Sequence, residues 1–164
     1  MKNKFLKLVN NKCKAIWAIE PDHLSFEMLK TGLTNTLNSK IINLALSEKE
    51  GKENFYQGFG FASKLSGYGN DIVNVIALDS LNIDATFIKM HLEGGEYNAI
   101  IGARQTIKKN RPILAITLYH NKDGVWRTSL FLMNLLENYR FYFRLHSWAG
   151  TGAVLYAISE ERLG

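Results

Sequence analysis

The chain has 164 residues, of which 46% are hydrophobic and 21% are charged. This length fits about one domain, and the balance of apolar and charged residues excludes a disordered or fibrous protein. The sequence has no apolar run near the roughly 18 residues of a membrane span, and a single cysteine, Cys13, excludes an intramolecular disulfide. We therefore expect one globular domain over residues 1–164, located in the cytoplasm.

The net charge of +5 comes from the first fourteen residues, which hold five lysines and no acid. The rest of the chain carries fifteen basic and fifteen acidic residues, and such a neutral body argues against nucleic acid as a partner. Lysines interrupt the apolar residues of the basic segment, so it lacks the core of a secretion signal. We expect a short helix there, with Phe5, Leu8 and Val9 on its buried side.

Apolar runs that alternate with amphipathic segments predict strands and helices in turn. The helix that follows the first strand begins near Pro21 and Asp22, and its apolar side consists of Leu24, Met28, Leu29 and Leu33. In chain order we expect a strand at 15–19, this helix to 33, strands at 40–46, 53–56, 73–77 and 86–92, a helix over 97–107, a strand at 113–119, a helix at 127–137, and strands at 141–145 and 153–158. This alternation predicts an α/β fold with a mostly parallel, doubly wound sheet.

Polar residues follow several of these strands, at the sheet edge where open α/β folds bind their ligands. Glu20 could accept hydrogen bonds from the vicinal hydroxyls of a ribose, or could simply stabilise the start of the next helix. Glu93 and Glu96 flank two glycines, which let the backbone approach a ligand closely, although acids at a helix start are stabilising by themselves. The rule selects six residues: Glu20, Ser47, His91, Glu93, Glu96 and His120.

The two histidines end neighbouring predicted strands. With Glu93 they could form a set of two histidines and one carboxylate, as metal ligands or proton carriers. Because His91 and His120 are not spaced as a helical i,i+4 pair, the pattern is weak evidence for a metal ion, and we predict none.

Eight short motifs follow one another along the chain: Ala18–Asp22, Asn43–Ser47, Leu78–Leu81, Phe87–Glu96, Gly102–Ala103, Pro112–Ile116, Tyr119–His120 and Val154–Ala157. In order and spacing, this series resembles the FkbM-type methyltransferases, over nearly the whole chain. The resemblance implies a Rossmann-like methyltransferase fold that uses S-adenosylmethionine to methylate an oxygen of a saccharide or another specialised metabolite.

The resemblance also implies roles for single residues. Glu20 matches the ribose-binding acid, Ser47 lies where the adenine pocket would be, and Glu93 and Glu96 match the acidic motif that faces the donor and the acceptor. We expect His91, Glu93 or His120 to accept the proton of the acceptor hydroxyl.

The chain departs from the family at His91, where an aspartate is usual, and at Gly152–Ala153, where an acid is frequent. The family's first strand and its glycine-rich turn would precede residue 1, so the resemblance describes an N-terminally truncated methyltransferase. The alternative is a catalytically inactive binding or interaction module. In the family's sheet that strand lies between those ending at Ile19 and Met90. We therefore expect these two to pair directly, another chain to fill the gap in a homo-oligomer, or the chain to be poorly stable.

Overall fold

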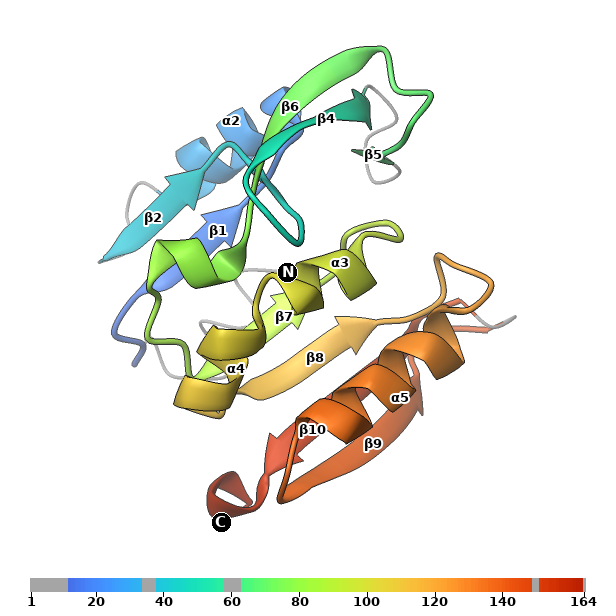
Figure 1. The fold of residues 1–164 in the computed structure, drawn as a ribbon. Coiled ribbons are helices and arrows are strands. Elements are labelled where there is room, and N and C mark those ends of the chain that lie inside the picture. Colours follow the sequence, from blue (N-terminus) through green and yellow to red (C-terminus); the bar gives the residue numbers. More distant parts are fainter. Residues whose placement is uncertain (1–11, 34–37, 58–62, 149–150, 164) are drawn as a thin grey trace. The chain divides into compact units, whose positions relative to one another are not determined.

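The computed structural model describes residues 12–33, 38–57, 63–148 and 151–163 (Figure 1). The helix predicted around Phe5, Leu8 and Val9 lies outside these residues. The chain divides into two compact units, one up to residue 45 and one from residue 46 onward. In the described part of the chain, no helix is both long and apolar enough to cross a membrane.

The first unit is a strand, a helix and a second strand. β1 (Ile16–Ile19) and β2 (Ser39–Ile42) pair in parallel, and α2 (His23–Leu33) lies between them in the chain. Asp22 caps the helix, since its Oδ1 accepts the Ser25 N–H at 2.9 Å. The predicted strand and helix are confirmed, but β1 is only half-buried.

The predicted apolar side of α2 is partly wrong. Leu24 and Met28 are 68% and 77% exposed, whereas Leu33 is buried. Phe26 and Leu29 are half-buried, and with Leu33 they form a stripe at i, i+3 and i+7. Leu29 and Leu33 of the predicted side are therefore confirmed, and Phe26 takes the place of Leu24 and Met28.

The second unit contains two mixed sheets. The first has the order β3 (Ala45–Leu46), β6 (Asp71–Ile76), β4 (Gly51–Tyr56) and β5 (Lys64–Leu65), with β4 antiparallel to both of its neighbours. The expected strand over 40–46 is therefore two strands, β2 and β3. Asn43 separates them, because its side-chain amide donates to the backbone oxygens of Glu20 at 2.8 Å and Pro21 at 3.1 Å.

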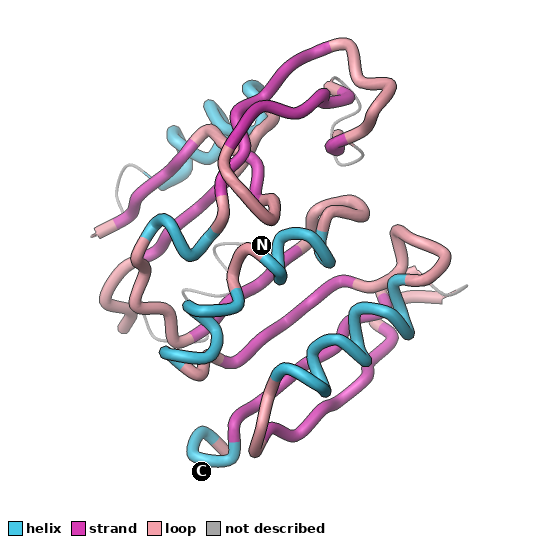
Figure 2. The backbone as a smooth tube through the Cα atoms, in the orientation of Figure 1, coloured by secondary structure: helices cyan, strands magenta, loops and turns pink. Residues whose placement is uncertain are grey.

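The second sheet has the order β7 (Phe87–Met90), β8 (Ile113–Thr117), β10 (Ala153–Ser159) and β9 (Tyr139–Leu145) (Figure 2). β7 and β8 are parallel, while β10 is antiparallel to β8 and β9. The helices α3 (Glu96–Ile101) and α4 (Arg104–Asn110) connect β7 to β8, and α5 (Gly124–Leu135) connects β8 to β9.

The core of the second unit is built around β8. Its residues Leu114 to Thr117 are all buried, as the continuous apolar run predicts. β7 alternates instead, with Ile88 and Met90 buried and Phe87 exposed. The short helix η2 (Leu78–Leu81) supports α4, because the two oxygens of Asp79 accept the first N–H groups of that helix, from Gln105 at 3.0 Å and Thr106 at 2.7 Å.

The predicted α/β class is confirmed. A mostly parallel sheet is not, because antiparallel pairs accompany the parallel pairs β1–β2 and β7–β8. Among the described residues, β7 is the end strand of its sheet and β8 is its neighbour. The pairing expected for the strands that end at Ile19 and Met90 stays a prediction.

Candidate functional site

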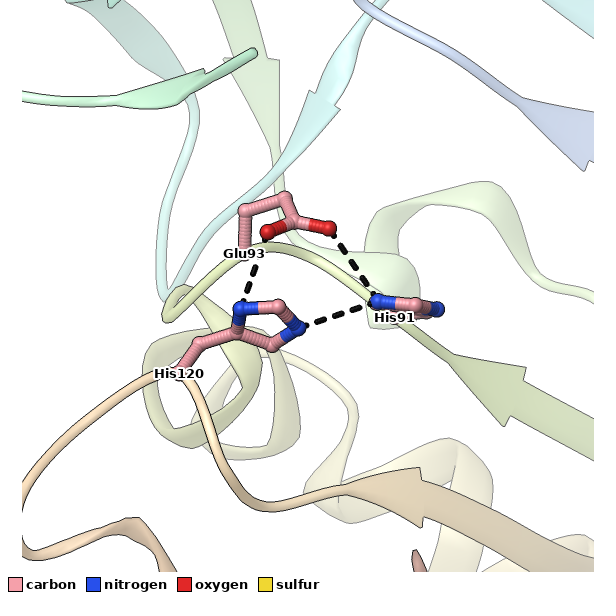
Figure 3. Close-up of side chains that lie close together, drawn as sticks. All are labelled: His91, Glu93 and His120. Carbon is pink, nitrogen blue, oxygen red and sulfur yellow. Dashed lines mark hydrogen bonds and ion pairs between the residues drawn. The ribbon is translucent and has the colours of Figure 1, made fainter. Parts of the chain in front are cut away.

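Three of the predicted site residues meet beyond the ends of β7 and β8. His91 directly follows β7, Glu93 lies in the loop after it, and His120 comes three residues after β8. Because the two strands are parallel neighbours, their following loops leave from the same end of the sheet. Figure 3 shows the three side chains turned toward one another. We call His91, Glu93 and His120 the histidine–glutamate cluster.

The cluster is held by close polar contacts. Glu93 Oε1 lies 3.1 Å from His91 Nε2, and Glu93 Oε2 lies 2.9 Å from His120 Nδ1. The two Nε2 atoms are 3.0 Å apart. The contact between the two Nε2 atoms is a hydrogen bond, in which one nitrogen carries the proton and the other accepts it.

The environment keeps both imidazoles neutral near pH 7. Burial, followed by the neighbouring His91 and Lys64, lowers the pKa of His120 to about 4. Burial and then the charge of Lys89 lower the pKa of His91. The His91 side chain is 33% exposed, against 18% for Glu93 and 16% for His120, so the cluster is open to solvent on the His91 side.

The loop that carries Glu93 has an unusual backbone. Glu93 and Gly94 have φ angles of 52° and 108°, in the region that favours glycine. The buried Glu96 holds this loop, because its carboxylate accepts the N–H groups of Leu92 at 2.7 Å and Gly94 at 3.0 Å. Asn121 adds a bond from its amide to the Gly94 oxygen at 2.6 Å. Glu96 is thus directed at the loop that presents Glu93.

The other two predicted residues have hydrogen-bond partners of their own. Ser47 is 1% exposed, and its hydroxyl donates to Glu53 Oε1 at 2.7 Å. Glu20 belongs to the first unit, where its Oε1 accepts the Asp22 N–H at 2.9 Å. Burial, and to a smaller extent the charge of Asp22, raises the pKa of Glu20 against the lowering effect of that hydrogen bond. The ligand-binding roles of both residues stay predictions.

Two features of the site were not predicted from the sequence. Tyr119 Oη lies 3.3 Å from His91 Nε2, and its position next to His120 was the only available signal. A cavity of about 320 Å³ lies beside the loop and is lined by Glu53, Asn54, Leu65, Ser66, Gly67, Gly94, Gly95 and Asn98. The two glycines of the loop therefore line this cavity.

An α/β fold with polar side chains gathered beyond the ends of parallel strands is a frequent scaffold for ligand-binding enzymes. The chain belongs to the methyltransferase FkbM domain family, whose profile matches residues 2–143. Its fold is similar to that of the crystal structure of Methyltransferase FkbM from Methylobacillus flagellatus KT, with a TM-score of 0.79 and 24% sequence identity over 95% of this chain. The chain spans 40% of the length of that protein. A comparison with curated proteins finds no match.

Proposed function

We propose that the chain is a cytoplasmic, S-adenosylmethionine-dependent O-methyltransferase that acts on a hydroxyl of a saccharide or another specialised metabolite. The observation that carries this proposal is the histidine–glutamate cluster at the ends of β7 and β8, in a chain of the FkbM methyltransferase family. An oxygen that is methylated must lose its proton, and the cluster offers groups that can take it.

Within the cluster, His120 is the best-placed proton acceptor. Glu93 Oε2 lies 2.9 Å from its Nδ1, so the carboxylate would stabilise the imidazolium that forms when His120 takes the proton of an acceptor hydroxyl. Glu93 is then a positioning residue whose negative charge favours the protonated form of His120. His91, 3.0 Å from the same Nε2, lies on the solvent-open side, where an acceptor can enter.

S-adenosylmethionine, when bound, supplies a methyl group on a positively charged sulfur. We assign Glu20 to its ribose, because a carboxylate can accept both vicinal hydroxyls and the Asp22 N–H already fixes its orientation. We assign Ser47 to the adenine pocket. Because its hydroxyl already donates to Glu53, Ser47 would contact the adenine through its backbone or shape the pocket by its position. Glu96 fits a positioning role, because its carboxylate holds the backbone around Glu93.

Donor binding and methyl transfer can be measured separately. Saturation-transfer-difference NMR detects weak binding of S-adenosylmethionine to the full chain, and isothermal titration calorimetry detects tight binding. We expect a signal from one of the two methods, and Glu20→Gln should weaken it. Glu27→Gln is the matched control, because Glu27 is an exposed acid of the same unit, paired only with Lys30 at 3.4 Å in the described contacts. Transfer is followed with a radiolabelled methyl group on a panel of saccharides and other hydroxyl compounds. Glu93→Gln and His120→Asn should keep donor binding and lose transfer.

Absence of any donor signal would contradict the proposal. An equal signal from wild type and Glu20→Gln would remove Glu20 from the donor site. Donor binding without transfer to any member of the panel would favour the alternative of a catalytically inactive binding module.

A further inference from the structure

Electron-rich atoms crowd around one nitrogen of the cluster. His91 Nε2 has three neighbours within hydrogen-bond distance: His120 Nε2 at 3.0 Å, Glu93 Oε1 at 3.1 Å and Tyr119 Oη at 3.3 Å. A proton on His91 Nε2 can point at only one of them. A single cation placed among these atoms would be attracted to all of their lone pairs at once.

The spacing of the atoms suits a metal ion. Ligand atoms of His91, Glu93 and His120 all lie within 4.8 Å of one another, in the one such group among the described residues. With ligand bonds of about 2.0–2.2 Å, a tetrahedral centre has ligand atoms roughly 3.3–3.6 Å apart. The observed separations of 3.0 and 3.1 Å around His91 Nε2 need an adjustment of only a few tenths of an ångström.

We propose that His91 Nε2, His120 Nε2 and Glu93 Oε1 bind one divalent transition-metal cation of the Zn²⁺ type. Two nitrogens and one carboxylate oxygen favour such ions over Mg²⁺ and Ca²⁺, which prefer oxygen ligands. Three protein ligands leave a position for water or another oxygen on the solvent-open side of His91. The sequence offered these three residues as possible metal ligands, but their spacing along the chain is not that of a helical pair, and we predicted no metal there.

This inference goes beyond the proposed function, because the cation can bind whether or not the chain transfers methyl groups. The cation site and the proposed methyl transfer both involve the acceptor hydroxyl. A hydroxyl bound to such a cation has a lowered pKa, so the cation would take over the task assigned above to His120.

The binding experiment uses the full chain, produced without a histidine tag and stripped with a chelator. Isothermal titration calorimetry with Zn²⁺ should show one ion per chain, and Co²⁺ should give visible absorption bands of a nitrogen- and oxygen-bound ion. Mg²⁺ at the same concentration should give no heat. A chain that binds neither Zn²⁺ nor Co²⁺ would overturn the proposal.

Variants locate the ion. His120→Asn and Glu93→Gln should each lower Zn²⁺ affinity by about 100-fold, since even partners of metal ligands commonly contribute 10–100-fold. His146→Asn and Cys13→Ser are the controls: His146 is an exposed histidine whose Nε2 lies 2.9 Å from Tyr156 Oη, and Cys13 is the free thiol. Both controls should bind Zn²⁺ as the wild type does, and loss of binding in either would place the ion elsewhere.

A folding defect is separated from a ligand defect by His91→Asp. This variant keeps a metal-binding atom at the position, so it should retain binding and shift its preference from Zn²⁺ toward Mn²⁺. Circular dichroism of each variant checks the fold. If His91→Asp has the circular dichroism of the wild type and binds no ion, the assignment of His91 is wrong. Metal binding without donor binding would leave this inference standing while the proposed function fails.

Discussion

Gly94 is the residue of the site loop whose substitution should cost most in backbone energy. Its φ of 108° lies outside the conformations open to other residues, and a Cβ there would lie 2.8 Å from Asn121 Oδ1. The Asn121 amide, which donates to the Gly94 oxygen, would have to move. Backbone strain alone costs about 1–3 kcal/mol, so we expect Gly94→Ala to lower the free energy of unfolding by about that much.

Gly95→Ala is the matched control one residue away. Gly95 has helical angles, φ −82° and ψ −1°, as the residue before α3, and a Cβ there would meet Leu92 O at 3.3 Å, a contact that a small shift relieves. We expect it to change stability by less than about 0.5 kcal/mol. Both glycines line the same cavity, so the pair separates backbone conformation from the loss of space.

Urea unfolding followed by circular dichroism measures both variants. With an m value of about 2 kcal/mol/M, Gly94→Ala should lower the urea midpoint by roughly 0.5–1.5 M. The Zn²⁺ affinity of Gly94→Ala should decrease as well, because the strained residue is next to Glu93 in the chain. Equal midpoints for the two variants would refute the strain argument.

Two further predictions concern the second unit. Leu132→Ala should cost about 2–5 kcal/mol, because Leu132 is 0% exposed, whereas Leu130→Ala on the same helix should cost less than about 0.5 kcal/mol, because Leu130 is 54% exposed; urea midpoints compare them. The Arg111 guanidinium lowers the pKa of the Glu161 carboxyl to about 2. This stabilisation is fully present above pH 4.5, the ordinary value, and is lost as the pH falls toward 2. Glu161→Gln should thus lower the melting temperature at about pH 6 and have little effect near pH 2, and an equal loss at both would contradict the ion pair's role.

The elements that depend on local pattern could be predicted from the sequence. β8 is a continuous apolar run, and it is buried as such runs predict. The helix expected over 97–107 is instead two helices, since α3 ends at Ile101 and α4 begins at Arg104. A Cβ on Gly102 would lie 2.1 Å from Ser47 O, so a distant segment packs against the chain at this point. Contacts of this kind are set by tertiary structure and leave no periodic signal in the sequence.

The same distinction applies to the site. That His91 and His120 lie close together follows from two adjacent parallel strands, and this was predictable. The separate roles of Glu93 and Glu96 were not, because both are acids of one short motif. Which of them faces the cluster depends on the backbone turn at Glu93 and Gly94, and glutamate itself does not favour that turn.

The left-handed backbone of Glu93 lowers the stability of the chain, whereas its carboxylate is needed for the proposed metal binding and methyl transfer. A residue with a Cβ pays about 1 kcal/mol or more for this conformation, and glycine does not. Glu93→Gly and Glu93→Ala both remove the carboxylate from the cluster, so both should lose Zn²⁺ binding and methyl transfer. They differ in backbone freedom, and at a φ of 52° we expect the glycine variant to be more stable than the alanine variant by about 1 kcal/mol in urea unfolding. The opposite order would mean that the loop relaxes out of the left-handed region once the carboxylate is gone. The contacts of Glu93 with the two histidines, rather than the bonds from Glu96 to the loop, would then hold the turn.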